Sequence, residues 1–231
     1  LLVPVLLLVS IISFSLFYLS PGDPAEILLT GPQGPPDPAA VEEFRQRAGF
    51  NDPAPAMYLR WLSKVIEGDL GYSYVSGGKV SNAVLDSFRP TMRLALISLV
   101  ISLLISFPLG ILSAVRQGSF VDGLGMAVSL LGVSIPNFWL AYLLIILFSL
   151  RLDILPVAGY GMGGDIEHLI LPAVTLGISA AAVTSRMIRT SMLESLEQDY
   201  IVAARARGLS ERSVVLRHAL RNALLPVITV V

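Results

Sequence analysis

The 231-residue chain contains no cysteine, only two histidines and few charged residues. Without cysteine it has neither a disulfide scaffold nor a thiolate metal site. Charged residues make up 14% of the chain, against about 25% in soluble domains. The formal net charge is −1, so the chain lacks the basic balance typical of nucleic-acid binding. Together with 54% hydrophobic residues and a mean hydropathy of +0.74, these absences indicate a protein whose partner is the lipid bilayer and not nucleic acid.

Signatures of catalysis are also missing from the sequence. There is no G-x-x-x-x-G-K-[ST] motif, so nothing is built to cradle nucleotide phosphates. His168 and His218 fall on opposite sides of the membrane in the orientation derived below, and neither lies in a predicted span. An intramembrane serine protease needs a base beside its nucleophile, so this class is not supported. We interpret Asp165, Glu167 and His168 as solvated loop residues, and expect no catalysis, cofactor or metal site.

Four uncharged apolar stretches are long enough to cross a bilayer, which takes about 20 residues at 1.5 Å each. They are Leu1–Leu19, Leu94–Val115, Gly123–Leu150 and Leu169–Ser185, and a fifth begins at Asn222–Val231. The third is too long for one straight crossing, and Pro136 predicts a kink in it. The first lacks the charged start of a signal peptide and is long for its apolar region, so we interpret it as a span. The sequence predicts an all-α integral membrane protein, and we expect a fragment lacking N- and C-terminal parts.

Basic residues set the expected orientation of these spans. The region from Arg186 to Arg221 holds seven arginines and four acidic residues, a balance typical of the cytoplasmic side. Counting back through the spans puts the N-terminus and Arg116 inside, and residues 20–90 and 151–168 outside. We therefore expect a multi-pass protein of the cell (inner, cytoplasmic) membrane with a cytoplasmic N-terminus.

The long outer segment has the pattern of a folded region. Asp37-Pro38 predicts the start of a short helix that ends at Gly49, and Asp52-Pro53 the start of a second that ends at Gly68. The second helix has one apolar face, formed by Tyr58, Trp61, Leu62, Val65 and Ile66. This face either docks on the outer ends of the membrane helices or lies among lipid headgroups. Contact with a delivered substrate or an outside partner is the alternative.

Small and polar residues mark two features inside the spans. A stripe of small residues repeats every four positions: Ser98, Ser102, Ser106 and Gly110. We predict that it is a packing face, because small residues let another helix approach closely, although a stripe of hydroxyls also suits a wet pathway. Asn137, beside Pro136, is the most polar residue at membrane depth, and Thr175 and Ser179 lie in the fourth span. These three are candidate pathway residues, with interhelical hydrogen bonding as the alternative.

The segment DYIVAARARGLSERSVVLRHALRNALLP, residues 199–226, places five arginines between two spans. We predict a first helix from about Met192 to Arg207, ended by Gly208 in the left-handed conformation. Ser210 is then a suitable N-cap for a second helix that leads into the next span.

Two interpretations fit this basic segment. A basic helix lying on anionic lipid explains the arginines. A surface shaped for a protein partner also explains the helix break and the flat, small surface that we expect Ala203 and Ala204 to form together. We therefore favour a protein-binding surface.

The pattern Ala203-Ala204-x-x-x-Gly208, followed after nine residues by His218-x-Leu220, resembles the EAA loop of binding-protein-dependent ABC transporter permeases. The chain departs from the general loop pattern at Val202, His218 and Arg221, where glutamate, isoleucine and proline are usual. The variant resembles the subfamily that imports dipeptides, oligopeptides and, in some members, nickel. Three further stretches agree with that subfamily: YLRWLSKVIEGDLGYS, RPTMRLALISLVISLLISFPLGILSAV and SIPNFWLAYLLIILFSLRLDILPVAGYG.

This resemblance implies a type I ABC importer permease bundle. Two permease subunits would work with two cytoplasmic ATP-binding subunits and an extracytoplasmic solute-binding protein, and ATP hydrolysis would belong to the ATP-binding subunits. The loop, at about 191–221, would hold coupling helices in a cleft of the ATPase, whose closure rocks the spans. The matching coupling residues are Ala203, Ala204, Arg205, Arg207, Gly208, Leu209 and Ser210. We expect an N-terminal part at 1–90 and a permease domain at 91–231.

Two other classes remain as alternatives, a secondary transporter and a membrane receptor or anchor. A secondary transporter is expected to have ionisable residues at membrane depth for ion coupling, and the four predicted spans contain none. A receptor or anchor accounts for the spans but not for the glycine-broken loop. Because substrate affinity is expected mainly in the binding protein, the chain carries few marks of its solute, be it a dipeptide, an oligopeptide, nickel or another.

Overall fold

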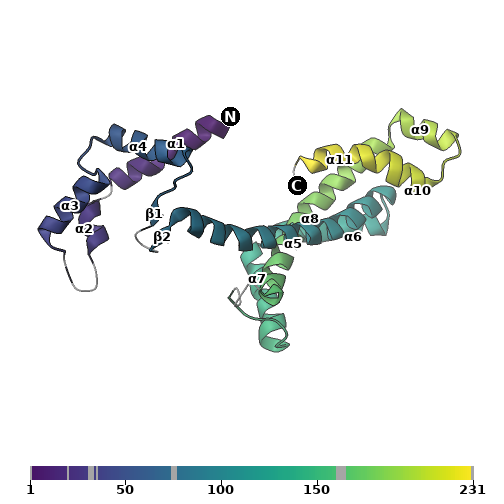
Figure 1. The fold of residues 1–231 in the computed structure, drawn as a ribbon. Coiled ribbons are helices and arrows are strands. Elements are labelled where there is room, and N and C mark those ends of the chain that lie inside the picture. Colours follow the sequence, from purple (N-terminus) through teal and green to yellow (C-terminus); the bar gives the residue numbers. More distant parts are fainter. Residues whose placement is uncertain are drawn as a thin grey trace. The chain divides into compact units, whose positions relative to one another are not determined.

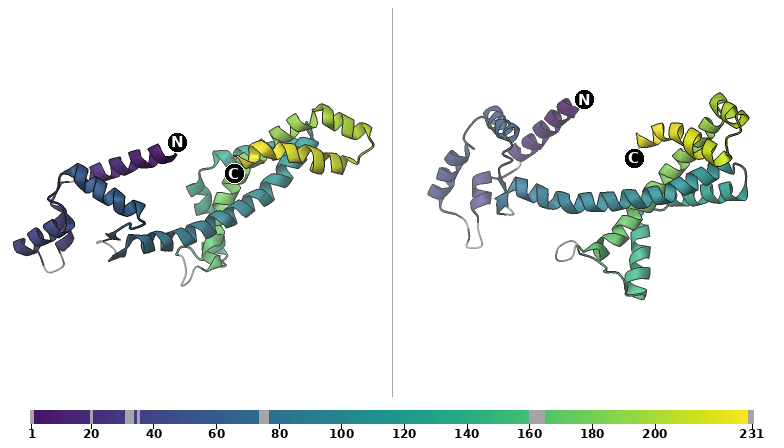
Figure 2. Two further views of the ribbon diagram at one scale, coloured as in Figure 1. Left: turned by 45° about the horizontal axis from the view of Figure 1, so that its top comes forward. Right: turned by 45° about the vertical axis from the view of Figure 1, so that its right-hand side comes forward.

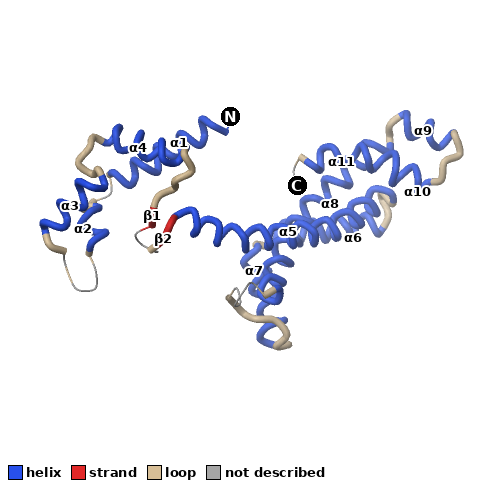
Figure 3. Tube along the Cα trace, in the orientation of Figure 1, coloured by secondary structure: helices blue, strands red, loops and turns tan. Residues whose placement is uncertain are grey.

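The computed structural model describes residues 2–19, 21–30, 34, 36–73, 77–159 and 165–229, and helices make up most of it (Figures 1 and 3). The chain divides into two compact units, Leu1–Phe88 and Arg89–Val231. These units fall close to the expected domain limits of 1–90 and 91–231. Leu1, at the start of the first predicted span, and Val230 and Val231, at the end of the last, lie outside the described residues.

Unit 1 begins with one apolar helix followed by short helices and a hairpin. Its elements are α1 (Leu2–Tyr18), α2 (Pro24–Leu29), α3 (Pro38–Ala48), α4 (Ala54–Ile66), the antiparallel pair β1 (Tyr72–Ser73) and β2 (Gly78–Lys79), and the start of α5 (Val80–Val115). The 17 residues of α1 rise about 26 Å, at the short end of the range for a bilayer crossing. It corresponds to the first predicted span.

The two predicted outer helices are confirmed as α3 and α4. Asp37 caps α3 by accepting a hydrogen bond from the backbone of Ala39 at 3.0 Å, and Gly49 ends it with φ 73°. Gly68, with φ 88°, follows the end of α4. The start of α4 differs from the prediction, because Pro53 occupies the N-cap while Asp52 forms an ion pair with Arg60.

Part of the apolar face of α4 docks on α1. The hydroxyls of Tyr58 and Ser10 lie 2.8 Å apart, and the ring of Tyr58 meets the edge of Phe14 with centroids 5.4 Å apart. Ile66, at the far end of the same face, is 79% exposed. The structure therefore shows Tyr58 docked on α1, but its hydroxyl meets Ser10 in the middle of that helix and not at the expected outer end.

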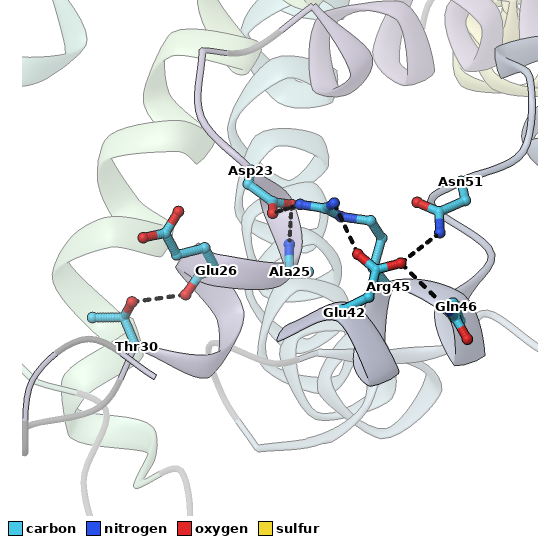
Figure 4. Close-up of polar contacts among 8 residues, drawn as sticks. All are labelled: Asp23, Ala25, Glu26, Thr30, Glu42, Arg45, Gln46 and Asn51. Carbon is cyan, nitrogen blue, oxygen red and sulfur yellow. Dashed lines mark hydrogen bonds and ion pairs between the residues drawn. The ribbon is translucent and has the colours of Figure 1, made fainter. Parts of the chain in front are cut away.

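A polar network joins α2 to α3, as Figure 4 shows. Asp23, which caps α2, forms an ion pair with Arg45 of α3, and Arg45 also donates to Glu42 at 3.1 Å. Glu42 accepts further hydrogen bonds from Gln46 at 3.1 Å and Asn51 at 3.2 Å. The bond from Arg45 holds the pKa of Asp23 below its ordinary value, and those from Gln46 and Asn51 lower the pKa of Glu42. This polar network joins α2 to α3 alongside the buried side chains of Ala25 and Val41.

Unit 2 contains the longest helices of the described chain. After α5 come α6 (Phe120–Ser134), α7 (Asn137–Leu144) and the π-helix η1 (Ile145–Arg151), then α8 (Ile166–Leu196), α9 (Asp199–Ala206), α10 (Glu211–Ser213), the π-helix η2 (Val214–Ala219) and α11 (Leu220–Ile228). Among the described residues, α5 and α8 are each long and apolar enough to cross a membrane, and the pair α6 and α7–η1 makes a third crossing if counted as one span.

The third predicted span is broken more sharply than a proline kink. Its two halves, Phe120–Ser134 and Asn137–Arg151, meet at 99°. Ile135 and Pro136 both take extended conformations between them, and the Pro136 carbonyl accepts the first hydrogen bonds of α7. The expected kink at Pro136 is therefore corrected to a full break, because two consecutive residues leave the helical conformation.

The predicted packing face on α5 is confirmed. Its members Ser98, Ser102, Ser106 and Gly110 are all buried. A Cβ on Gly110 would lie 2.7 Å from the carbonyl oxygen of Ser185 and 2.8 Å from Ile188, both on α8. Closer to the N-terminal end of α8, a Cβ on Gly177 would lie 2.7 Å from the Ile101 side chain of α5. Small residues on each helix therefore allow the two backbones to approach closely.

Candidate functional site

The long helix α8 does not continue into the predicted coupling helix. It ends at Leu196, and Gln198 takes an extended conformation before α9 begins at Asp199. The expectation of one helix from about Met192 to Arg207 is therefore wrong. The reason is burial: the break returns Ile201 to the core formed with Ile188 and Met192, all fully buried.

The loop folds back against α8, and a continuous apolar core holds the two together. Figures 1 and 2 agree that α11 lies beside α8, and α9 and η2 complete the same packed structure. The buried members of the core are Ala114, Ile188, Met192, Ile201, Ala204, Val214, Val215, Ala219, Ala223 and Val227. The Ser195 hydroxyl donates a hydrogen bond of 3.0 Å to the carbonyl of Ala219, and it is also hydrogen bonded to the Tyr200 hydroxyl. The loop is a packed part of unit 2.

The two alanines of the motif face different ways. Ala204 is fully buried in the core, whereas Ala203 is exposed. The expectation that they form one small surface is corrected, because adjacent residues of a helix point about 100° apart and the core fixes Ala204 inward. Ala203 remains on the exposed surface of the loop together with Arg205, Arg207, Leu209 and Ser210.

The predicted turn at Gly208 is confirmed. Gly208 has φ 77°, directly after the last residue that closes α9, and nothing lies within 4 Å of where its Cβ would be. Arg205 and Glu211 bridge the turn with two hydrogen bonds, of 2.8 and 3.3 Å, and this contact raises the pKa of Arg205. Ser210 occupies the N-cap of α10 as predicted, but its side chain makes no capping hydrogen bond.

The other arginines of the segment point outward. Arg212, Arg217 and Arg221 are exposed, and none has a carboxylate within 4.0 Å in the part of the chain that the structure describes. Arg207 donates to the carbonyl of Ala203 at 3.3 Å. Beyond the turn at Gly208, the loop thus presents exposed arginines without a carboxylate partner among the described residues.

The structure brings the candidate pathway residues together. The Ser179 hydroxyl of α8 donates to the Asn137 side chain at the start of α7. It also reaches the carbonyl of Thr175 at 3.1 Å, while the Thr175 hydroxyl, which is buried, donates to the carbonyl of Leu171 at 2.8 Å. The interhelical hydrogen bond expected as the alternative is thus present between Asn137 and Ser179, and Asn137 itself is exposed.

Sequence reasoning missed a buried ion pair between α6 and α8. Arg189 donates from Nε and Nη2 to the two carboxylate oxygens of Asp122, at 2.6 and 2.8 Å. The backbone N–H of Gly118 donates to the same carboxylate at 3.0 Å, and Asp122 is only 6% exposed. The signal in the sequence was an isolated acid just before the third apolar stretch and an arginine just after the fourth, on the side expected to be cytoplasmic.

The comparisons with known proteins agree with this architecture. Residues 106–231 match the family described as "Binding-protein-dependent transport system inner membrane component", and residues 2–95 match its N-terminal region. The chain is 39% identical to the oligopeptide transport system permease protein AppB of Bacillus subtilis (strain 168), over 99% of this chain and 74% of the relative. It is also 39% identical to the glutathione transport system permease protein GsiC of Escherichia coli (strain K12), over 99% of this chain and 72% of the relative. The chain therefore belongs to the family of inner-membrane permeases of binding-protein-dependent ABC transport systems.

Proposed function

We propose that this permease subunit imports short peptides or a related small solute. Two relatives at 39% identity are named for oligopeptide and glutathione transport, and glutathione is itself a tripeptide. A peptide is therefore the substrate class that these relatives share. Nickel, which the sequence resemblance also suggested, is the alternative solute.

We further propose that the loop at about 191–221 receives the push of separate cytoplasmic ATP-binding subunits. The observation that carries this proposal is the sealed core beneath the loop, in which Ile201, Ala204 and Val214 are fully buried against α8. A force applied to the exposed turn therefore moves α8, because close-packed interiors transmit strain. Exposed Ala203, Arg205, Arg207, Leu209 and Ser210, with Gly208 at the turn, form the proposed contact surface.

The remaining proposed partners are the lipid bilayer, a second permease subunit and an extracytoplasmic solute-binding protein. Much of α5 is apolar and exposed, with Leu104 71% exposed, which suits lipid and a second permease subunit. An extracytoplasmic solute-binding protein would deliver the solute to the outer side. Asn137, Thr175 and Ser179 are the proposed pathway residues, since Asn137 is exposed while hydrogen bonded to Ser179.

The proposed orientation puts the N-terminus and the loop inside and residues 20–90 outside. In its support, Asp122 at the start of α6 pairs with Arg189 of α8, so the two helix ends assigned to the cytoplasm are neighbours. Because the chain has no cysteine, single Ser63→Cys and Ser210→Cys variants can be labelled with an impermeant thiol reagent on intact cells. We expect labelling at position 63 only, and labelling at position 210 only would reverse the orientation.

Uptake by the complete transporter tests the function directly. The chain is purified with its partner permease and ATP-binding subunits, reconstituted in liposomes and supplied with the binding protein. We expect ATP-dependent uptake of a labelled peptide that unlabelled peptides suppress and nickel does not. Uptake driven by an ion gradient without ATP would instead favour a secondary transporter. Suppression of uptake by nickel alone would make nickel, and not a peptide, the proposed substrate.

A further inference from the structure

Three contacts fasten α6 to α8 along one face of each helix. The ion pair of Asp122 with Arg189 is at one end, and the hydroxyls of Ser129 and Ser185 lie 2.9 Å apart one to two turns away. Next along both helices, Gly132 approaches α8 so closely that a Cβ there would lie 2.7 Å from the Cβ of Ala182. These positions recur three, four or seven residues apart, which is the spacing of a single helix face.

The ion pair lies between the proposed coupling loop and the break at Ile135 and Pro136. Ile188, directly before Arg189, is fully buried in the core that seals the loop. At the other end of α6, the chain breaks at Ile135 and Pro136 and turns by 99° into α7. A movement of the loop therefore passes to α8, which is joined to α6 by these three contacts and also bonds Asn137 of α7 directly through Ser179.

The geometry of the ion pair suits the transfer of a directed movement. A guanidinium that bonds both oxygens of one carboxylate fixes orientation as well as distance. The third hydrogen bond, from Gly118, holds the carboxylate to the turn that precedes α6. Sliding or rotation of α8 against α6 would break both bonds from Arg189 to a carboxylate that is mostly withdrawn from water.

We propose that Asp122 and Arg189 are positioning residues that make α6 follow α8, so that movement of the coupling loop reaches the broken span at Pro136. The inference rests on the proposed coupling role of the loop. A pair that only supports the fold would affect the stability of the transporter and leave its coupling unchanged, so the two roles have different consequences.

The first test measures coupling in the complete reconstituted transporter. The variants are Asp122→Asn, Arg189→Met and the charge exchange Asp122→Arg with Arg189→Asp. We expect the single variants to keep basal ATP hydrolysis but to lose about tenfold of its stimulation by loaded binding protein, a size typical of coupling between distant sites. The charge exchange should recover part of this stimulation. Wild-type stimulation in both single variants would overturn the proposal, whereas a wild-type transporter without ATP-dependent uptake would refute the proposed function itself.

The second test does not depend on how the charge variants fold. Ser129→Cys with Ser185→Cys places two thiols where hydroxyls lie 2.9 Å apart, within reach of a disulfide. The chain has no other cysteine, so one defined cross-link forms. We expect the cross-linked transporter to work at the rate of the reduced one, with each single-cysteine variant under the same oxidant as the control. Transport that stops on oxidation and returns on reduction would show that α6 and α8 must separate, and a pair that fails to cross-link would contradict the contact.

Discussion

The proposed coupling loop, at about 191–221, and the proposed outer segment, at 20–90, are both made of short helices with several arginines, yet they are held together differently. In the loop, Ile201, Ala204 and Val214 are fully buried and form one core with α8. In the outer segment, α2 and α3 are joined by the ion pair of Asp23 with Arg45 and the polar bonds around it. Close apolar packing resists deformation, whereas exposed ion pairs contribute little and respond to salt and pH. The difference fits the proposal that the loop transmits a push from the ATP-binding subunits.

Overpacking the core of the loop should give the largest effect. Ala204→Leu adds bulk at a fully buried position, and we expect it to destabilise unit 2 by about 1–3 kcal/mol. Ala203→Leu is the matched control, since the same change one residue earlier is exposed and should alter stability by about 0.5 kcal/mol or less. Thermal unfolding of the permease purified without its ATP-binding subunits measures both, because Ala203 belongs to the surface proposed to contact those subunits. Equal losses of stability in the two variants would mean that the loop is not packed against α8 through a buried core.

The small-residue face of α5 gives a second test of close packing, in a helix expected to span the membrane. Ser102 is almost fully buried between the close contacts at Ile101 and Gly110. Ser102→Leu should lower assembly or stability by about 1–3 kcal/mol, because bulk there forces the helices apart. Ser102→Ala keeps the packing and should be nearly silent in stability and in uptake. Full assembly of the alanine variant with failed uptake would assign Ser102 to the pathway.

Features set by a few neighbouring residues could be predicted from the sequence. Asp37-Pro38 and Gly49 bound α3, and Gly208 takes the left-handed turn, because these residues have strong local preferences. The spacing of small residues on α5 likewise predicts a packing face, since it depends only on helical periodicity.

Features that depend on distant partners could not be predicted from the sequence. The pair Asp122 and Arg189 joins residues 67 positions apart, and nothing local identifies either as the other's partner. The break after Leu196 exists because Ile201 is buried against α8, which the helix-forming residues around it do not indicate. The same core decides that Ala204 faces inward and Ala203 outward.

The turn at Gly208 tests whether backbone geometry alone matters where packing is absent. Because nothing lies within 4 Å of the Cβ position, a substitution there meets no steric obstacle. Gly208→Val should still cost about 1–2 kcal/mol, the penalty of a left-handed conformation for a residue with a Cβ. Gly208→Asn should cost less, because asparagine tolerates this conformation. We expect stimulated ATP hydrolysis to fall in the valine variant more than in the asparagine variant, and wild-type coupling with valine would remove Gly208 from the coupling mechanism.

The smallest expected effect is a pH response confined to the outer segment. Arg45 holds the pKa of Asp23 below the 3.8 of an unperturbed aspartate, so the unfolded segment binds a proton more readily than the folded one. Stability from this contact is therefore fully present above about pH 4 and is lost as pH falls through the lower, folded-state pKa. Hydrogen exchange of the α2 and α3 backbone, followed by mass spectrometry from pH 6 down to about pH 3 and corrected for the exchange of the unfolded peptides, should show this loosening. Asp23→Asn should exchange faster at neutral pH and lose part of the pH response, with the part due to Glu42 remaining, whereas the core of α8, α9 and η2 should stay protected throughout. Loosening of that core in the same pH range would show that the two regions are not held by different forces.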